Sequence, residues 1–202
     1  MKITVLQPPP FEPVTLAEVH KHLRLDLDGS PASHPDDDML QRLIATARGQ
    51  VESMARRSLV QRTLRLSVEA FGDAVRLVRP PVLRVESVTY FDTSNVLQVL
   101  DPATYFVTDD EVPELLMANG ASAPSTYSRP DALRIEYVAG YAPDGSPATT
   151  QADYAGGVPS ELKDAILLSV QLLYDSLAPN ERTAIENMRE ALIQPLRVQL
   201  TV

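Results

Sequence analysis

The longest regular pattern of apolar positions in the chain lies between Asp36 and Ser58. Its apolar residues recur every three or four positions, which is the one-sided stripe of an α-helix rather than the alternation of a strand. They are Leu40, Leu43, Ile44, Ala47, Val51, Met54 and Ala55. Because such a stripe is unstable in water by itself, we expect other helices to cover it.

Three further segments have a helical pattern. The sequence from Thr15 to Glu18 is a capping box, which predicts a short helix that ends near Leu25. A helix that begins near Pro159 is apolar on most sides, as expected of a buried helix. The last helix is predicted over about Asn180 to Gln194, with its apolar face formed by Ala184, Ile185, Met188, Ala191 and Leu192. We expect these helices and the long one to share a core.

Between residues 61 and 141 the apolar period changes to two. Leu64, Leu66 and Val68 alternate with polar residues, and several such short runs are separated by turn residues. The sequence therefore predicts an α+β fold, with a mainly helical core of about four helices, discontinuous in sequence, and an inserted antiparallel β lobe. The predicted parts are a helical core at 1–60 and 158–194, the β lobe at 61–145, a linker at 146–157 and an extended C-terminal tail at 195–202.

The composition narrows the classes of function. A chain of 202 residues with 44% hydrophobic residues is long enough for one sizeable core, and its net charge of -9 argues against a general DNA-coating surface. It has no cysteine, so neither disulfides nor thiolate metal sites are expected. No apolar run approaches the ~20 residues of a membrane span, so we expect a soluble protein without a membrane partner.

Candidate catalytic and metal-binding groups are few. His20 and His22 lie two positions apart on a predicted helix, and His34 lies in a loop, so none has metal-ligand spacing. The sequence contains no P-loop, GxSxG or GxGxxG motif. We therefore predict no catalytic residue, no cofactor and no metal site, and no enzyme activity. The basic cluster Arg56, Arg57 and Arg62 is a candidate for phosphate or partner contact, for which helix-end complementarity is the simpler explanation.

A series of short motifs, in order along nearly the whole chain, resembles one family. The motifs are Pro9-Pro10-Phe11-Glu12-Pro13-Val14-Thr15-Leu16-Ala17-Glu18-Val19, His22-Leu23-Arg24-Leu25, Leu43-Ile44-Ala45-Thr46-Ala47-Arg48, Val51-Glu52, Arg79-Pro80-Pro81-Val82, Val85-Glu86-Ser87-Val88-Thr89-Tyr90, Tyr105, Tyr137-Val138-Ala139-Gly140-Tyr141, Val158-Pro159 and Leu162-Lys163 with Ala165-Ile166. The chain resembles the head–tail connector proteins, also called adaptor or head-completion proteins, of long-tailed double-stranded DNA phages and gene transfer agents.

The resemblance implies a structural virion protein. Such a connector forms a ring, typically a dodecamer, under the portal protein, extends the DNA channel, and docks the tail or stopper protein. The implied location is the neck of the virion at the head–tail interface, with the host cytoplasm as the site of assembly. A negatively charged protein suits a lumen through which DNA passes without sequence-specific binding.

The tail is the predicted partner-binding segment. Its apolar and polar positions alternate as in a strand, yet no neighbouring strand is predicted, so we expect it to add to a sheet of the portal or of a neighbouring subunit. Its residues are Leu196, Arg197, Val198, Gln199, Leu200, Thr201 and Val202.

Two alternatives remain open: a DNA-packaging accessory protein that binds nucleic acid directly, and an enzyme or ligand-binding protein with a cleft between core and lobe.

Overall fold

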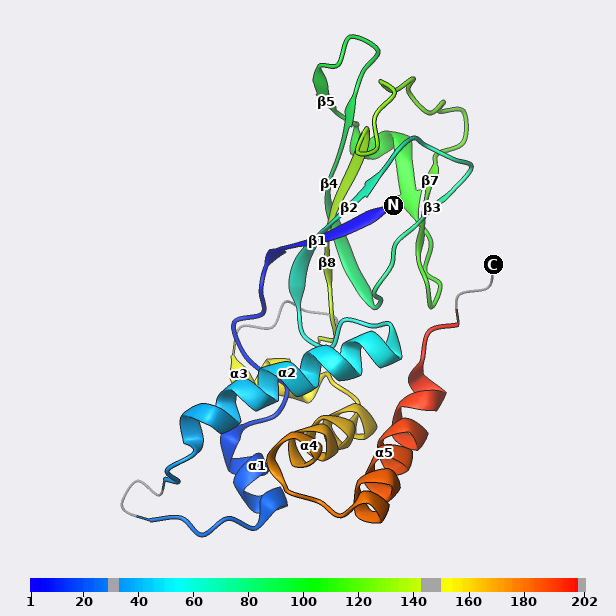
Figure 1. Ribbon diagram of the computed structural model, residues 1–202. Helices are drawn as coiled ribbons and strands as arrows, with labels where there is room; N and C mark the ends of the chain where they lie inside the picture. Colours follow the sequence, from blue (N-terminus) through cyan, green and yellow to red (C-terminus); the bar gives the residue numbers. More distant parts are fainter. Residues whose placement is uncertain (29–32, 143–149, 200–202) are drawn as a thin grey trace. The chain divides into compact units, whose positions relative to one another are not determined.

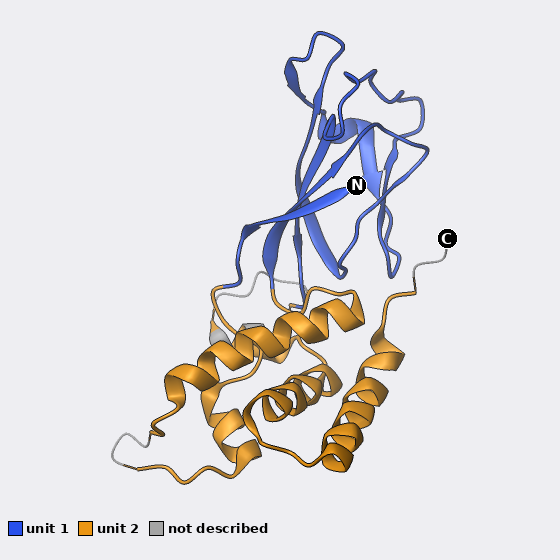
Figure 2. Cartoon of the chain, in the orientation of Figure 1, with its two compact units in different colours: residues 1–9, 61–141 blue, residues 10–60, 142–202 orange. Residues whose placement is uncertain are grey.

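The chain folds into two units, each discontinuous in sequence (Figures 1 and 2). The computed structural model describes residues 1–28, 33–142 and 150–199. The helical unit comprises 10–60 and 142–202, and the β unit comprises 1–9 and 61–141. Helices and antiparallel sheets thus occur together, and the prediction of an α+β fold is confirmed.

Three long helices, α2, α4 and α5, dominate the helical unit. Its elements are α1 (Leu16–Leu23), α2 (Asp37–Ala55), α3 (Gln151–Gly156), α4 (Ser160–Tyr174), α5 (Pro179–Ile193) and the 3-10 turn η3 (Gln194–Leu196). Helix α4 packs against α1, α2 and α5. It is buried on most sides, as its sequence predicts, while α2 buries the stripe Leu40, Ile44, Ala47, Val51 and Ala55. The predicted capping box is present at Thr15, where Glu18 donates its backbone N–H to the Thr15 hydroxyl.

Helix α5 is less covered than its sequence suggests. Of its predicted apolar face, Ile185 and Leu192 are half-buried, whereas Ala184, Met188 and Ala191 are exposed. The physical reason is that α5 packs mainly along α4 and makes only a small contact with α2. One strip of its apolar face therefore has no neighbouring helix within the described parts of the unit.

The β unit contains a five-stranded and a three-stranded antiparallel sheet. Its strands are β1 (Lys2–Gln7), β2 (Arg62–Val68), β3 (Val75–Arg76), β4 (Val82–Phe91), β5 (Leu97–Val99), β6 (Tyr105–Val107), β7 (Glu114–Met117) and β8 (Leu133–Ala139), with the 3-10 turn η1 (Pro102–Thr104) before β6. The strand orders are β1-β2-β8-β4-β5 and β3-β7-β6. The inner face of the larger sheet forms the core of this unit, where Leu66, Ile135 and Tyr137 are completely buried.

The structure differs from the predicted boundaries in four places. The β unit ends at residue 141 instead of 145. Residues 1–9 belong to the β unit and not to the helical core, because β1 pairs with β2. The predicted linker contains helix α3, whose first turn is capped by the Thr150 side chain; residues 146–149 lie outside the described residues. The described part of the tail forms η3 and a short extended segment, and no strand. Along the described chain, none of the helices is long and apolar enough to cross a membrane.

Candidate functional site

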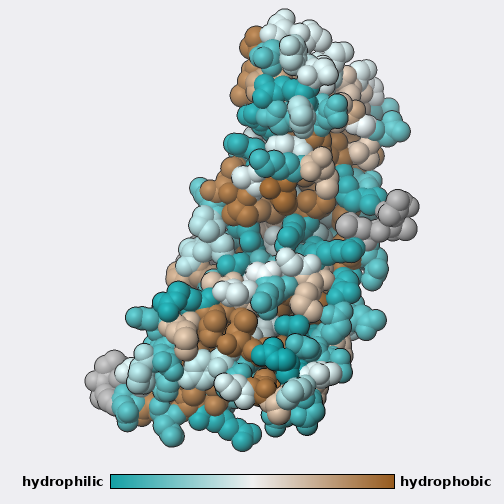
Figure 3. Space-filling model, in the orientation of Figure 1, coloured by the Kyte–Doolittle hydropathy of each residue, from teal (hydrophilic) through white to brown (hydrophobic). Residues whose placement is uncertain are grey.

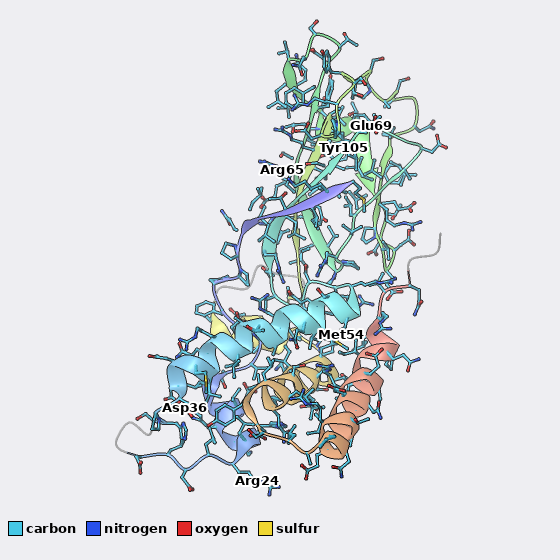
Figure 4. All side chains as sticks on the ribbon, viewed as in Figure 1. Arg24, Asp36, Met54, Arg65, Glu69 and Tyr105 are labelled. Atoms are coloured by element: carbon cyan, nitrogen blue, oxygen red, sulfur yellow. The ribbon has the colours of Figure 1, made fainter. Side chains whose placement is uncertain are left out.

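At the carboxyl end of α2, the predicted basic cluster and the predicted partner-binding tail come into contact. Arg56 adopts a left-handed backbone conformation with φ 58°, and the N–H of Arg57 donates to the carbonyl of Glu52, which closes the helix. The last carbonyls of a helix have no partner within it and need donors from elsewhere. Figure 4 labels Met54 at this end of α2, close to the end of α5.

The C-terminal tail supplies these donors. The N–H of Val198 donates to the carbonyl of Ala55 at 3.0 Å, and the Arg197 guanidinium donates to the carbonyl of Met54 at 2.9 Å. The same guanidinium also pairs with Glu190 of α5. A cation at this position is favoured by the negative end of the α2 dipole. The tail is therefore fastened to α2 and α5, and we call residues Leu196 to Val198 the tail anchor.

The predicted tail residues have different roles in this arrangement. Val198 is only 1% exposed, so its side chain is buried. The carbonyl of Leu196 accepts a hydrogen bond from Arg57. Gln199 is exposed, while Leu200, Thr201 and Val202 lie outside the described residues. Among the described tail residues, Val198 is thus a buried valine between a half-buried arginine and an exposed glutamine, and pairing of the tail with a partner's sheet stays a prediction.

The basic cluster predicted from the sequence does not form one site. Arg57 is buried and holds the tail anchor, whereas Arg56 is exposed at the helix terminus. Arg62 is the first residue of β2 and belongs to the β unit. The side chain of Arg57 thus contacts the tail at the carbonyl of Leu196.

The histidines join helices to one another. The Nε2 atom of His20 lies 2.6 Å from the Asp37 carboxylate at the start of α2, and the backbone N–H of His34 donates to that carboxylate at 3.1 Å. Burial alone would raise the pKa of Asp37, but the His34 N–H and the His20 ring together hold it below its ordinary value. His22 lies 3.2 Å from the amide oxygen of Gln171 in α4.

The carboxylates of Asp36 and Asp37 at the start of α2 thus have hydrogen-bond partners within the chain. The Tyr174 hydroxyl donates to Asp36 at 2.9 Å, and this hydrogen bond raises the pKa of Tyr174. Figure 4 labels Asp36 at the first turn of α2. Within the described ranges, no group of three or more His, Asp or Glu side chains has the geometry to hold a metal ion.

A second polar network lies along α2. Arg48 donates to Glu12 at 2.6 Å and to Glu52 at 3.1 Å, and Glu52 also accepts the backbone N–H of Leu59 at 2.9 Å. Glu52 is only 2% exposed, so its charge is balanced inside the unit. The arrangement fastens the segments before and after α2 to the helix, which is a structural role.

A groove of about 430 Å³ lies between α2, α4 and α5. Met54 and Leu173 form its apolar part, and Arg182 and Arg189 its polar part. Both arginines are already engaged, since Arg182 donates to the carbonyl of Leu172 and Arg189 to the hydroxyl of Ser169. The groove thus has the mixed character of a protein contact surface rather than the converging polar groups of an active site.

The larger sheet of the β unit is polar on its outer face. The Arg129 and Arg134 guanidinium groups both donate to Asp131 at 2.6 Å, and they hold the pKa of this carboxyl at about 2. The same two groups lie over the ring of Phe91, with distances of 3.9 and 4.9 Å from guanidinium carbon to ring centre. Beside them is a hollow of about 360 Å³ whose lining includes Lys2 and Arg65.

The inner face of this sheet is apolar to its margin. Ile3 and Val5 of β1 share the inner face with buried residues of β2, yet they are 37% and 48% exposed. Figure 3 shows apolar side chains gathered on the β unit where Figure 1 draws β1. This surface was not predicted, because residues 1–60 were assigned to the helical core and β1 pairs with a distant strand. The alternation of Lys2, Ile3, Thr4 and Val5 was the available signal.

The comparisons with known proteins concern the fold. No protein-family model matches the chain, and no curated protein matches it in sequence. A chain in the neck of an empty gene transfer agent (GTA) particle, computed with C6 symmetry, matches with a TM-score of 0.75 and 23% identity over 100% of this chain and 98% of that chain.

Two further structures agree with this match. A chain in the virion of a native GTA particle matches with a TM-score of 0.73 and 22% identity. A chain in the neck of a native GTA particle, computed with C12 symmetry, matches with a TM-score of 0.70 and 20% identity. Each match covers 100% of this chain and 98% of the other. The chain therefore has the fold of these particle proteins, with both units included.

Proposed function

We propose that this protein is a structural subunit of the virion neck: a head–tail connector, or adaptor, of a phage or gene transfer agent. It assembles as a ring beneath the portal protein, extends the DNA channel, and docks the tail or stopper protein. The observation that carries the proposal is the match of fold over the whole chain to chains from GTA particles, two of them from the neck. The C12 symmetry of one of these necks supports a ring of 12 subunits.

The charge of both units supports passage of DNA without capture. The helical unit has ten basic and sixteen acidic residues, and the β unit has eight basic and eleven acidic residues. Each unit is therefore net negative, and neither supplies the excess of basic residues that non-specific DNA binding requires. In a neck, a negative lumen lets DNA slide because the phosphates find few cations to bind.

We assign portal binding to the tail beyond its anchor. Leu196, Arg197 and Val198 are engaged within the helical unit, so they fix the point at which the chain leaves α2 and α5. Gln199, Leu200, Thr201 and Val202 are then the residues that reach the portal. In this arrangement a rigid anchor reduces the conformational entropy lost when the tail binds.

Co-sedimentation with the portal protein of the same particle tests this assignment. We expect the full chain to sediment with portal rings, and a variant lacking residues 199–202 to remain in the supernatant with an unchanged melting temperature. A variant in which these four residues are replaced by Gly-Ser-Gly-Ser is the matched control for length, and it should also fail to bind. Undiminished binding by both variants would contradict the assignment to the tail.

A further inference from the structure

The apolar rows of the five-stranded sheet continue to its β1 edge without being covered there. One row runs across the sheet through Val88, Ile135, Leu66 and Ile3. Its first three members are at most 1% exposed, but Ile3 is 37% exposed. An edge strand also presents backbone N–H and C=O groups without strand partners. The β1 edge thus has both properties of a surface to which another strand adds.

At the opposite edge of the sheet, the last strand covers only part of its neighbour. Strand β5 pairs only with Thr89 to Phe91 of β4, and the N–H of Leu100 donates to the carbonyl of Val88. Among the described residues, no strand pairs with the outer side of β4 from Val82 to Ser87. We call this stretch the β4 notch.

The β4 notch and β1 lie at the same level along the strand direction of the sheet. The register places Thr4, Arg65, Glu136 and Ser87 in one cross-strand row. The next row on the inner face contains Val5 at one edge and Val85 at the other, joined through Leu64 and Tyr137. A second copy of the chain, rotated about an axis parallel to the strands, would therefore bring its β1 to the notch of the first copy without any shift along the strand direction.

Strand direction and surface chemistry fit as well. Three successive antiparallel pairings separate β1 from β4, so β1 of a rotated copy runs antiparallel to the notch. Its Val5 then lies beside Val85 on the inner face, which buries the 48% of Val5 that is exposed in the single chain. Two register shifts in the notch, at Val82/Arg84 and Val85/Ser87, raise the local twist of this edge, so that only a short strand such as β1 fits along it.

We propose that β1 of one subunit adds to the β4 notch of the next subunit, so that the sheets join head to tail around the ring. The inference rests on the proposed function for the ring itself. A second copy of this chain is the occupant because the contact is heterologous: two different edges meet, and repetition by rotation closes a ring. The cyclic symmetry of the GTA necks that share the fold supports such a closure.

Thiol cross-linking tests the contact, since the chain has no cysteine of its own. The variant Thr4→Cys/Ser87→Cys carries one thiol on each edge of the same outer-face row. Within one chain these positions are three inter-strand spacings apart, roughly 14 Å, so a bismaleimide shorter than about 10 Å joins them only between copies. Two controls are matched: Thr4→Cys alone, and Thr4→Cys/Ser94→Cys, whose second thiol lies in the exposed turn after β4.

The reaction is run on the purified full chain at high concentration and on the fraction bound to portal rings. We expect a ladder of covalent oligomers from Thr4→Cys/Ser87→Cys and monomers from both controls. Portal-bound protein without a ladder would overturn the β1 contact and leave the proposed function standing. A ladder in free protein that never binds portals would support the contact and contradict the function. Dimers from Thr4→Cys alone, or no ladder in either fraction, would overturn the contact.

Discussion

The two units differ in where they place a paired carboxylate. The helical unit encloses a carboxylate, Glu52, together with its donors. The β unit keeps its ion pairs on a half-exposed sheet face, as between Arg65 and Glu136, and leaves Ile3 uncovered at its edge. The helical unit therefore balances a buried charge at Glu52 with several donors, whereas the ion pair of the β unit between Arg65 and Glu136 stays accessible to solvent.

Placing a charge in the helical core should have the largest effect. Val51 is completely buried on the covered face of α2, so Val51→Asp leaves a carboxylate without a partner and should cost at least about 4 kcal/mol of unfolding free energy. Urea denaturation measures the loss, and ring assembly should disappear with it. The control Gln41→Asp, at an exposed position of the same helix, should stay within about 0.5 kcal/mol of wild type.

Removing one carboxylate from each unit tests the contrast between them directly. Glu52→Ala leaves Arg48 and the Leu59 N–H without their buried acceptor and should cost about 3 kcal/mol. Glu136→Ala removes an ion pair whose partners are 27% and 35% exposed, and should cost less than about 1 kcal/mol. Equal losses in urea denaturation would show that the two units do not differ in this respect.

Loosening the tail anchor should have a smaller effect on stability and a specific effect on binding. Arg197→Met removes hydrogen bonds to the Met54 carbonyl and to Glu190, at a cost of about 1 kcal/mol. Amide exchange at Val198, whose N–H is held by Ala55, should become faster, and portal binding should weaken. Arg42→Met, at an exposed site on α2, is the control, and unchanged exchange at Val198 would count against the anchor.

The smallest expected effect is a pH dependence of the β unit. Asp131 has a pKa of about 2 instead of 3.8, because Arg129 and Arg134 hydrogen-bond its charged form. A carboxyl whose pKa is lower in the folded than in the unfolded protein stabilises the fold at any pH above its unfolded-state pKa. This stabilisation is lost as the pH falls through the folded-state pKa. Asp131→Asn should therefore lower stability by up to about 1 kcal/mol near neutral pH.

The difference between Asp131→Asn and wild type should shrink as the pH falls from 3.8 toward about 2. Thermal unfolding of both proteins across this range provides the comparison. A difference that stays constant with pH would show that Asp131 contributes through its shape and not through its charge.

The helices could be predicted from the sequence because their stripes are long. The stripe of α2 repeats over five turns and is opened by acidic residues, so length and period agree. Strand β1 was missed because the alternation of the four residues Lys2 to Val5 is a weak signal. Its pairing with β2, across about sixty residues of sequence, leaves no local trace. Helix α3 was missed although Thr150 and Asp153 form a capping box, because small polar residues around them favoured a linker.

The candidate site was only partly accessible to sequence reasoning. Arg57 and the tail were both singled out, but their hydrogen bond joins residues 139 positions apart. The alternation at Leu196 to Val202 does not distinguish a strand from an extended segment with one anchored side chain, and Val198 is such a side chain. The exposed margin at Ile3 depends on sheet order, which the pattern of one strand does not contain.

Electron microscopy of the full chain mixed with the portal protein of its particle is the most direct test of the proposed connector role. We expect averaged images in which a ring of this protein is stacked coaxially on the portal, with the channel continuous through both. Portal rings that remain bare at saturating concentrations of the folded chain, or single copies bound without a ring, would contradict the connector role.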